Sequence, residues 1–385
     1  MTVTAIICEY NPFHNGHEYL ISAAREQTKA DYIIAIMSGN FVQRGEPAII
    51  DKWARAKACL KAGVDMVVEL PCFASFAPAN LYAYYGVKTA HDLGVVNYLV
   101  FGSEKGLQAE DLRQLADKSD GDNSDFTKKL RENLASGISY AASISKSYGF
   151  EPGPNDILGI EYLRALKKLN SNIIPFPILR TQGQNVTSAS CLRMKISSGN
   201  INDCIDLMPE SSFNILKNEL SSGRAPVHLK NYESAIISSL RSKTVEDIKN
   251  LPYISEGLEY AIYKNALAHG TLDEIISATT CARYTSSRIR RICLASLLGI
   301  KAKDLEHNPG FIKAIGFRKS AGKLLDSIKN NSHVPVDISL SKLSVSDKRF
   351  TELAARSTDI YTLGYLNASE RIGDKEYTHC GVFES

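Results

Sequence analysis

The segment from Val3 to His17 constrains the fold more than any other part of the chain. Val3 to Cys8 is an apolar, β-branched run, which is the pattern of a buried strand. Pro12 ends this strand, because proline has no N–H for a β-ladder and restricts the residue before it. From His17 onwards, apolar residues recur at helical spacing. The segment therefore predicts a strand, a proline turn and a helix in immediate succession.

Two histidines and a glycine lie in this turn, as His14-Asn15-Gly16-His17. The N-terminus of a helix offers unpaired N–H groups and the positive end of a dipole, which suit a phosphate. Two imidazoles add donors, and Gly16 lets a ligand approach the backbone. The histidines could instead bind a metal or be surface residues without a role. A metal site would need further ligands at short spacing, and only Glu9 is near, so no metal site is predicted.

The motif resembles a known signature. His-x-Gly-His after a first strand resembles that of the nucleotidyltransferase superfamily, which includes the class I aminoacyl-tRNA synthetases. The longer string from Glu9 to His17, together with Met37 to Pro47, resembles the tRNA(Met) cytidine acetate ligase family. The resemblance runs over most of the chain and is strongest through about residue 105.

The resemblance implies an ATP-dependent ligase that acts on tRNA. Acetate would attack the α-phosphate of ATP to give acetyl-adenylate. The acetyl group would then pass to N4 of the wobble cytidine, position 34, of elongator tRNA(Met), forming N4-acetylcytidine. Mg²⁺ is expected with the nucleotide, since the charge of the triphosphate must be neutralised and few acidic residues lie near the motifs.

The resemblance also implies which residues contact ATP. They comprise the proline turn, the start of the following helix and three later points: Ile7, Cys8, Glu9, Tyr10, Asn11, Pro12, Phe13, His14, Asn15, Gly16, His17, Glu18, Tyr19, Leu20, Gly102, Asn155 and Arg180. Gly102 follows a predicted strand, where a glycine allows close approach of an adenosine. An ordinary strand-ending turn explains it equally well.

A second motif begins at Ser188. Ser188, Ser190 and Arg193 resemble the S-x-S-x-x-R phosphate motif of the superfamily. Hydroxyls at a helix start can bind phosphate oxygens, and arginine adds a fork of donors. A plain helix cap is the alternative, but pairing with His14 and His17 favours phosphate. These five residues are the predicted catalytic groups, which would stabilise the transferring phosphoryl group without a covalent intermediate.

The loop after the second strand is a candidate acetate site. Ser38, Asn40, Arg44 and Lys52 are the predicted substrate-binding residues, with the two cations as counter-charges for a carboxylate. A structural loop with solvated charges is the alternative, and Asp51 and Arg55 could equally form an exposed helix pair.

The chain departs from the family after Arg180. Family members have a glycine, a Tyr-His-Asp string and a longer loop there, whereas this chain has a short segment, Thr181 to Thr187. The resemblance therefore does not carry that loop's part in acetyl transfer or tRNA recognition over to this chain.

Strand and helix patterns alternate in the first half of the chain. This order predicts an α/β fold with a doubly wound parallel sheet, a HIGH-type, Rossmann-like nucleotidyltransferase domain, over residues 1–198. Ligands then bind beyond the carboxyl ends of the strands. The last strand of this half, Ile173 to Leu179, contains Pro175 and Pro177 and is expected at an edge. Residues 199–385 are predicted as a mainly helical, tRNA-binding domain, in which Val334 to Ser385 is ambiguous between short strands and helices.

A basic stretch in the second half is the candidate tRNA surface. Arg283, Arg288, Arg290 and Arg291 lie close together beside Tyr284, and few acidic residues follow before Lys303. A solvated helix face is the alternative. The net charge of +3 neither demands nor excludes a nucleic acid.

Composition and the chain start indicate a cytoplasmic protein. The 8 cysteines include no C-x-x-C pair, no signal peptide is evident, and no apolar run reaches membrane-spanning length. The oligomeric state cannot be predicted.

Two other functions fit part of the pattern. One is a nucleotidyltransferase that joins AMP to a small phosphorylated metabolite, although such proteins are usually shorter and lack a basic helical domain. The other is a non-catalytic tRNA-binding protein with a relic pocket. The short segment after Arg180 favours this last reading, and the intact His14, His17 and Ser188 motifs oppose it.

Overall fold

The computed structural model describes residues 1–118, 125–136, 138, 140–148, 152–180, 187–255 and 257–385. Within these residues the centre of the protein is an eight-stranded sheet. Its strands are β1 (Val3–Cys8), β2 (Tyr32–Ser38), β5 (Met66–Leu70), β6 (Tyr98–Ser103), β7 (Ile174–Leu179), β8 (Ile312–Arg318), β9 (Val336–Asp337) and β10 (Val382–Glu384). A small antiparallel ribbon, β3 (Phe41–Val42) and β4 (Glu46–Pro47), projects from the loop after β2.

The strand order is β10-β8-β5-β2-β1-β6-β7, with β9 beside β8. The five strands from β5 to β7 are mutually parallel, with Val3 opposite Tyr32 and Thr4 opposite Tyr98. The chain builds outward from β1 to β5 and then crosses to β6 on the other side. A topological switch point therefore lies between β1 and β6, where ligands bind in such folds. The predicted doubly wound fold is confirmed, and β7 lies at the edge, as its prolines predicted.

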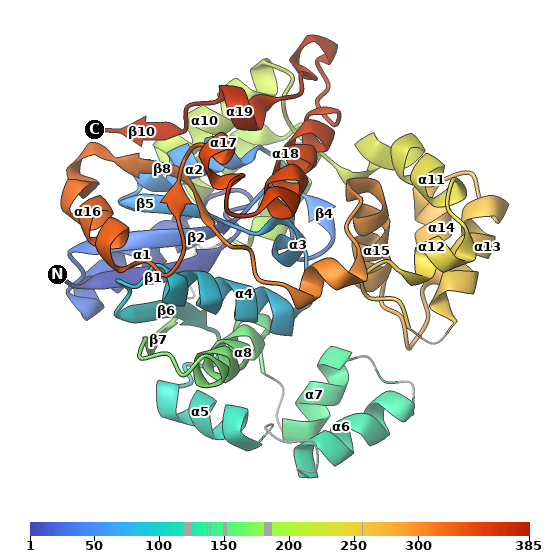
Figure 1. Ribbon diagram of the computed structural model, residues 1–385, viewed down its shortest axis with the longest axis horizontal. Helices are drawn as coiled ribbons and strands as arrows, with labels where there is room; N and C mark the ends of the chain where they lie inside the picture. Colours follow the sequence, from blue (N-terminus) through green and yellow to red (C-terminus); the bar gives the residue numbers. More distant parts are fainter. Residues whose placement is uncertain (119–124, 137, 139, 149–151, 181–186, 256) are drawn as a thin grey trace.

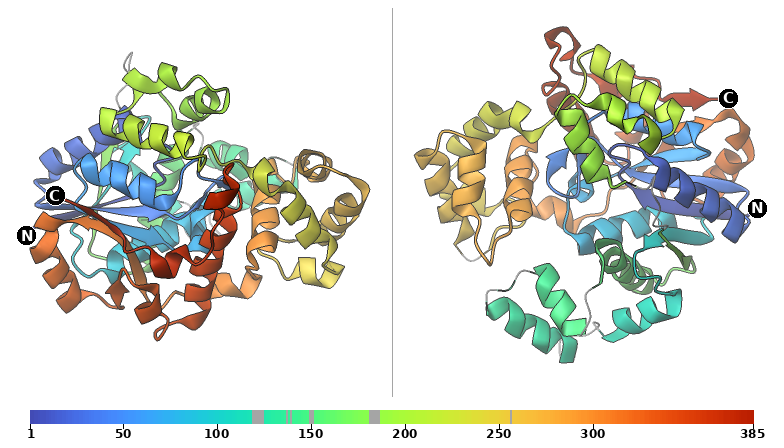
Figure 2. Two further views of the ribbon diagram at one scale, coloured as in Figure 1. Left: turned by 90° about the horizontal axis from the view of Figure 1, so that it is seen from above. Right: turned by 180° about the vertical axis from the view of Figure 1, so that it is seen from behind.

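Alternate residues of β1 face two different hydrophobic cores. Ile6 and Cys8 pack in one core, whereas Ala5 and Ile7 pack in the other. Helices therefore cover both faces of the sheet (Figure 1, Figure 2). The first core contains α1 (Asn15–Thr28), α2 (Lys52–Lys61), α9 (Ala189–Ser197) and α10 (Glu210–Ser221). The second contains α3 (Cys72–Ser75), α4 (Ala79–Asp92), α8 (Pro154–Lys168) and α18 (Lys348–Thr362).

Two groups of helices extend from this centre. Helices α5 (Ala109–Lys118), α6 (Asp125–Ala135) and α7 (Tyr140–Tyr148) lie at the lower edge in Figure 1. The second group, on the right in Figure 1, is α11 (Glu233–Arg241), α12 (Val245–Lys249), α13 (Leu258–Ala268), α14 (Leu272–Thr279) and α15 (Ser286–Leu298). We call this second group the helical group.

The second half of the chain also contributes to the sheet. Strand β8 pairs antiparallel with β5, and β10 pairs with β8, so residues 199–385 do not pack as a separate helical unit. A chain that ended at residue 198 would leave β5 as an open edge, and β8 covers it. The ambiguous segment from Val334 forms β9, β10, α17 (Leu340–Leu343), α18 and α19 (Lys375–Thr378), and α16 (Gly322–Asn331) precedes it. No helix in the described part of the chain has the length and apolarity to cross a membrane.

Candidate active site

A cleft lies at the carboxyl ends of β1, β6 and β7, next to the switch point. Its walls include Glu9, His17, Gly102, Asn155 and Arg180. These residues come from four separate parts of the first 180 residues. The structure thus brings the proline turn and the three later points predicted for ATP into one site.

The proline turn is held by aromatic packing. Tyr10 adopts a left-handed backbone conformation, with φ of 50°, which costs a non-glycine residue on the order of 1 kcal/mol. Its buried ring stands edge-on to Phe13 at 4.9 Å and to His17 at 5.0 Å, measured between ring centroids. The Asn11 side chain accepts a 2.9 Å hydrogen bond from the Ile49 N–H. These contacts fix where the helix α1 begins relative to β1.

The two histidines are stacked on one another. Their ring centroids lie 3.7 Å apart. Nδ1 of His14 accepts from the Gly16 N–H at 3.1 Å, and Nδ1 of His17 accepts from the His14 N–H at 3.2 Å. Because Nδ1 is an acceptor in both rings, each neutral ring carries its proton on Nε2. His17 lines the cleft, whereas His14 is 1% exposed and supports it from behind.

Both imidazoles are neutral at physiological pH. Burial, with the charges of Arg180 and Arg193, lowers the pKa of His14 to about 4. Burial and the neighbouring His14 lower the pKa of His17 well below its ordinary value. The rings therefore offer Nε2–H donors to a ligand without needing a positive charge.

The serine motif begins helix α9 beside this turn. Ser188 caps the helix, and its Oγ accepts from the Cys191 N–H at 3.2 Å. Ser190 is exposed. Arg193 donates from Nη1 to the main-chain oxygen of Asn11 at 2.8 Å, which ties α9 to the proline turn. Ser188 therefore caps α9, and the same helix lies beside the turn that carries the two histidines.

A hydrogen-bond network forms the opposite wall. Asn155 donates from its main-chain N and from Nδ2 to the Glu104 carboxylate, at 3.1 and 2.8 Å. Arg180 lies 3.5 Å from the same carboxylate. A Cβ on Gly102 would lie 2.9 Å from Cγ of Arg180, so only glycine leaves room for that side chain. Sequence reasoning found Gly102, Asn155 and Arg180 but did not identify Glu104 as the group that joins them.

The remaining predicted ATP contacts divide into two sets. Those that line the cleft are Ile7, Cys8, Glu9, Tyr10, Asn11, Gly16, Tyr19 and Leu20. The others do not line it: Pro12, Phe13, Asn15 and Glu18. Asn15 instead donates from Nδ2 to the main-chain oxygen of Asp206 at 2.9 Å. Sequence reasoning missed the apolar and aromatic walls, among them Tyr82, Phe101, Leu158, Tyr162 and Leu179. Three of them, Tyr82, Leu158 and Tyr162, lie on helices. Apolar residues at helical spacing are typical of core-facing positions, so the pattern did not distinguish these residues from the core.

Of the predicted acetate-binding residues, only Arg44 reaches the cleft, and it is exposed. Ser38 is buried. Asn40 donates from Nδ2 to Thr358 Oγ1 at 3.1 Å, and its Oδ1 accepts from the Lys52 N–H at 2.9 Å. The Lys52 ammonium is buried between the carboxylates of Glu69 and Glu376. The structure therefore separates Arg44 from the other three.

The suggestion that Arg55 forms an exposed pair with Asp51 is wrong, because Arg55 is fully buried. Its guanidinium donates to the main-chain oxygens of Glu9 at 2.7 Å, Ser38 at 3.0 Å and Ile50 at 3.2 Å, and also to that of Gly39. This single cation joins the ends of β1 and β2. Two strands that end side by side leave carbonyl groups without ladder partners, and Arg55 satisfies them.

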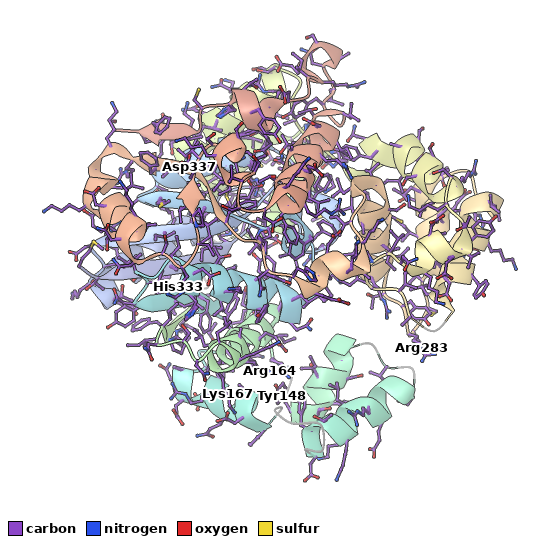
Figure 3. The ribbon with its side chains drawn as sticks, in the orientation of Figure 1. Tyr148, Arg164, Lys167, Arg283, His333 and Asp337 are labelled. Atoms are coloured by element: carbon purple, nitrogen blue, oxygen red, sulfur yellow. The ribbon has the colours of Figure 1, made fainter. Side chains whose placement is uncertain are left out.

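The four predicted RNA-binding arginines are engaged differently. Arg288 donates to the main-chain oxygen of Tyr253 at 2.8 Å and to Ser255 Oγ at 2.7 Å. Arg290 pairs with Glu46 at 2.7 Å, and Arg291 donates to the Gln43 oxygen at 2.9 Å. Arg283 is exposed at the outer end of the helical group (Figure 3). The contacts of Arg290 and Arg291 fasten α15 to the loop between β3 and β4, which carries Arg44 and which we call the ribbon loop.

One potential cation-binding cluster lies far from the cleft. Among the described residues, His91, Asp92 and His333 are the group that could hold a metal ion (His333 is labelled in Figure 3). Lys88 already occupies the Asp92 carboxylate, at 2.7 and 2.9 Å. Asp92 is the last residue of α4, and the chain then enters β6 at its amino end. The cluster therefore lies at the amino ends of the strands, and none of its residues lines the cleft.

Comparisons with known proteins agree with this geometry. The family model described as HIGH Nucleotidyl Transferase matches residues 1–376. A tRNA(Met) cytidine acetate ligase of Acetivibrio thermocellus is 38% identical, over 98% of this chain and 99% of its own. Another, from Caldanaerobacter subterraneus subsp. tengcongensis, is 37% identical over 95% and 96% of the two chains. The chain belongs to the tRNA(Met) cytidine acetate ligase family, within the HIGH nucleotidyltransferases.

Solved structures of this family have the same fold. The crystal structure of Thermotoga maritima TmcAL bound with alpha-thio ATP superposes with a TM-score of 0.92 and 32% identity, covering 100% of this chain and 99% of that one. The apo form of the same protein gives the same TM-score at 31% identity. In the segment after Arg180 in which this chain departs from the family pattern, Thr181 to Thr187, residues 181–186 lie outside the described residues.

Proposed function

We propose that this protein activates acetate with ATP and transfers the acetyl group to N4 of the wobble cytidine of elongator tRNA(Met). The observation that carries the proposal is the pair of stacked, neutral imidazoles at the N-terminus of α1, facing the Asn155–Glu104–Arg180 network across one cleft. Curated relatives of nearly equal length bear the name of this activity, and the solved relative holds an ATP analogue.

The first half-reaction needs charge stabilisation more than covalent chemistry. An acetate oxygen attacks the α-phosphorus of ATP, and pyrophosphate leaves. Nε2–H of His17 would donate to the phosphoryl oxygens as negative charge develops there, and the positive end of the α1 dipole would favour that charge. Arg193 and the Ser188–Ser190 segment lie beside the turn and would take the leaving pyrophosphate. His14 would act by holding the His17 ring.

The opposite wall would hold the adenosine. Gly102 makes room for the Arg180 side chain at the end of β6, and Glu104 holds Asn155 and Arg180 in place. The exposed Arg44 is the remaining candidate counter-charge for acetate. Mg²⁺ would arrive with the triphosphate, because Mg²⁺ typically keeps several waters and is bound through substrate phosphates and one or two carboxylates. Glu9, the carboxylate that lines the cleft, and Glu104, which holds the cleft residues Asn155 and Arg180, are both engaged with main-chain N–H groups.

The tRNA would lie over the helical group and the ribbon loop. Helix α15 carries Arg290, which pairs with Glu46, and Arg291, which donates to the main-chain oxygen of the cleft residue Gln43. Phosphates held by the outer part of this group would bring the anticodon towards Arg44. A tRNA substrate in turn implies action in the cytoplasm.

Isotope exchange tests the proposal directly. Labelled pyrophosphate should return to ATP in the presence of acetate and Mg²⁺ without tRNA, because adenylation of a free carboxylate is reversible. Longer fatty acids should not support exchange. Adding tRNA(Met) with labelled acetate should then give one acetylated cytidine, located by mass spectrometry. Exchange that requires a phosphorylated metabolite instead of acetate would refute the ligase assignment, and binding of tRNA without any exchange would identify a relic.

A further inference from the structure

The carboxylate of Glu9 is held in the cleft with one oxygen left for a ligand. Glu9 follows the last residue of β1 and lines the cleft with His17. Oε1 accepts a 2.8 Å hydrogen bond from the Gln43 N–H, and the main-chain oxygen accepts from Arg55 at 2.7 Å. Oε2 makes no hydrogen bond within the part of the chain that the structure describes. The residue is thus fixed at both ends, and its second carboxylate oxygen is available.

An anionic side chain is unsuited to the phosphates that this cleft is expected to bind. A carboxylate repels a triphosphate, whereas it accepts hydrogen bonds from amines. Two amines enter the proposed reaction, N6 of adenine and N4 of the target cytidine. The position of Glu9 favours cytidine. The main-chain N–H of Gln43 holds Oε1 of Glu9, and the main-chain oxygen of Gln43 accepts from Arg291 of the helical group. Glu9 therefore adjoins the side from which the tRNA would approach.

We propose that Oε2 of Glu9 binds the N4 amine of the target cytidine and takes up the proton that this amine loses on acetylation. The inference rests on the proposed function and assigns it a base. Nitrogen N4 attacks the acetyl carbonyl carbon, and a C–N bond forms. The bond from that carbon to the adenylate oxygen breaks, and its electron pair leaves with AMP. The N4 proton passes to Oε2 of Glu9 and then to water.

The surroundings of Glu9 suit this role. Burial raises the pKa of Glu9 above its ordinary value, against the Gln43 hydrogen bond and the arginine charges. The charged and titratable groups that face it from its neighbours are Arg44, Arg55, Arg193 and Arg291, with Cys8, Tyr82 and Tyr162. A carboxylate whose pKa lies nearer neutrality is a stronger base than an ordinary glutamate. A glutamate that accepts from N4 also rejects uridine, which presents an oxygen acceptor at the same place.

The test separates the two half-reactions in the Glu9→Gln variant. Glutamine keeps the shape and can still accept from the Gln43 N–H, but it cannot take a proton. Acetate-dependent pyrophosphate exchange should fall far less than tRNA acetylation, because no proton leaves an amine in that half-reaction. Trapping of acetyl-adenylate by hydroxylamine, a strong nucleophile, should survive likewise. Single-turnover acetylation of tRNA(Met) should fall by about 100-fold or more, as expected when a general base is lost. The rise of that rate with pH should also disappear in the variant.

Glu104→Gln is the matched control, because it also neutralises one carboxylate, which contacts the cleft residues Asn155 and Arg180. Glu104 holds Asn155 and Arg180, so exchange, trapping and tRNA acetylation should all fall together when ATP is below saturation. A parallel loss of all three activities in Glu9→Gln would overturn the inference and assign Glu9 to the nucleotide. Acetylation that stays within threefold, with an unchanged pH profile, would overturn it too. Absence of exchange in the unmodified enzyme would instead refute the proposed function itself.

Discussion

The ammonium nitrogen of Lys52 lies 2.6 Å from Oε2 of Glu69, and this ion pair is closed off from the active-site cleft. Glu376 from α19 also contacts Lys52, and Lys313 from β8 contacts both carboxylates. Burial would raise the pKa of Glu69, but the charges of Lys52 and Lys313 outweigh it and lower that pKa. The cluster joins α2 and the sheet to the C-terminal elements of the chain.

Replacing Lys52 should therefore damage stability more than acetate binding. In Lys52→Met, two buried carboxylates share the single Lys313 charge, and the free energy of unfolding should fall by about 3–5 kcal/mol. Urea denaturation measures this. Arg44→Met is the matched control, since Arg44 is exposed and lines the cleft. It should raise the KM for acetate in the exchange assay with little change in stability. A Lys52 variant of normal stability with a raised acetate KM would restore Lys52 as the acetate counter-charge.

Loss of the His17 ring should abolish most of the first half-reaction. His17→Ala removes the Nε2–H donor at the start of α1, and exchange should fall by about 100-fold or more. The midpoint of thermal unfolding should change little by comparison. His91→Ala, which removes an imidazole from the far end of α4, should leave exchange unchanged. Near-normal exchange in a folded His17→Ala protein would remove His17 from the catalytic groups.

Stability should depend on pH through the buried imidazoles. The pKa of His14 falls from 6.5 to about 4 on folding, so between these values the unfolded chain binds a proton that the folded protein does not. Stability should therefore rise with pH across this window and be lost as the pH falls from 6.5 towards 4. Each such group contributes a slope of up to about 1.4 kcal/mol per pH unit.

The variant His14→Asn isolates this effect. Asparagine caps a helix well but does not titrate, so α1 should keep its start. Urea midpoints measured from pH 4 to pH 7 should show a shallower slope than in the unmodified protein, with His17 still contributing in the same direction. An identical slope in both proteins would mean that His14 is not buried as a neutral ring.

The arginines of the second half should divide into two functional classes. Arg283→Ala should weaken tRNA binding and reduce the slope of log affinity against log salt by about one unit, without altering exchange. Arg291→Ala should lower exchange as well, because Arg291 holds the main-chain oxygen of Gln43, next to Arg44, the candidate counter-charge for acetate. Filter binding across a salt series measures the first effect. Equal salt slopes in the Arg283 variant and the unmodified protein would show that this residue lies outside the tRNA surface.

The sequence by itself determined the local features of the site. The Val3–Cys8 run, the break at Pro12 and the helix after it are set by backbone sterics and by periodicity, which act over a few residues. The alternation of strands and helices likewise determined the doubly wound order, and the prolines of β7 placed it at an edge. The family followed from two short strings near the start of the chain, Glu9 to His17 and Met37 to Pro47.

Tertiary structure decided which charges face the ligand and which are buried. Lys52 and Arg55 have the spacing of an ordinary polar helix face, yet both are fully buried because their partners, Glu376 and the carbonyls of Glu9 and Ser38, come from distant parts of the chain. The pairing of β8 with β5 is equally invisible in local periodicity, since the two strands are separated by more than 240 residues. Long-range pairing and desolvation depend on what the whole chain brings together, and no local pattern records them.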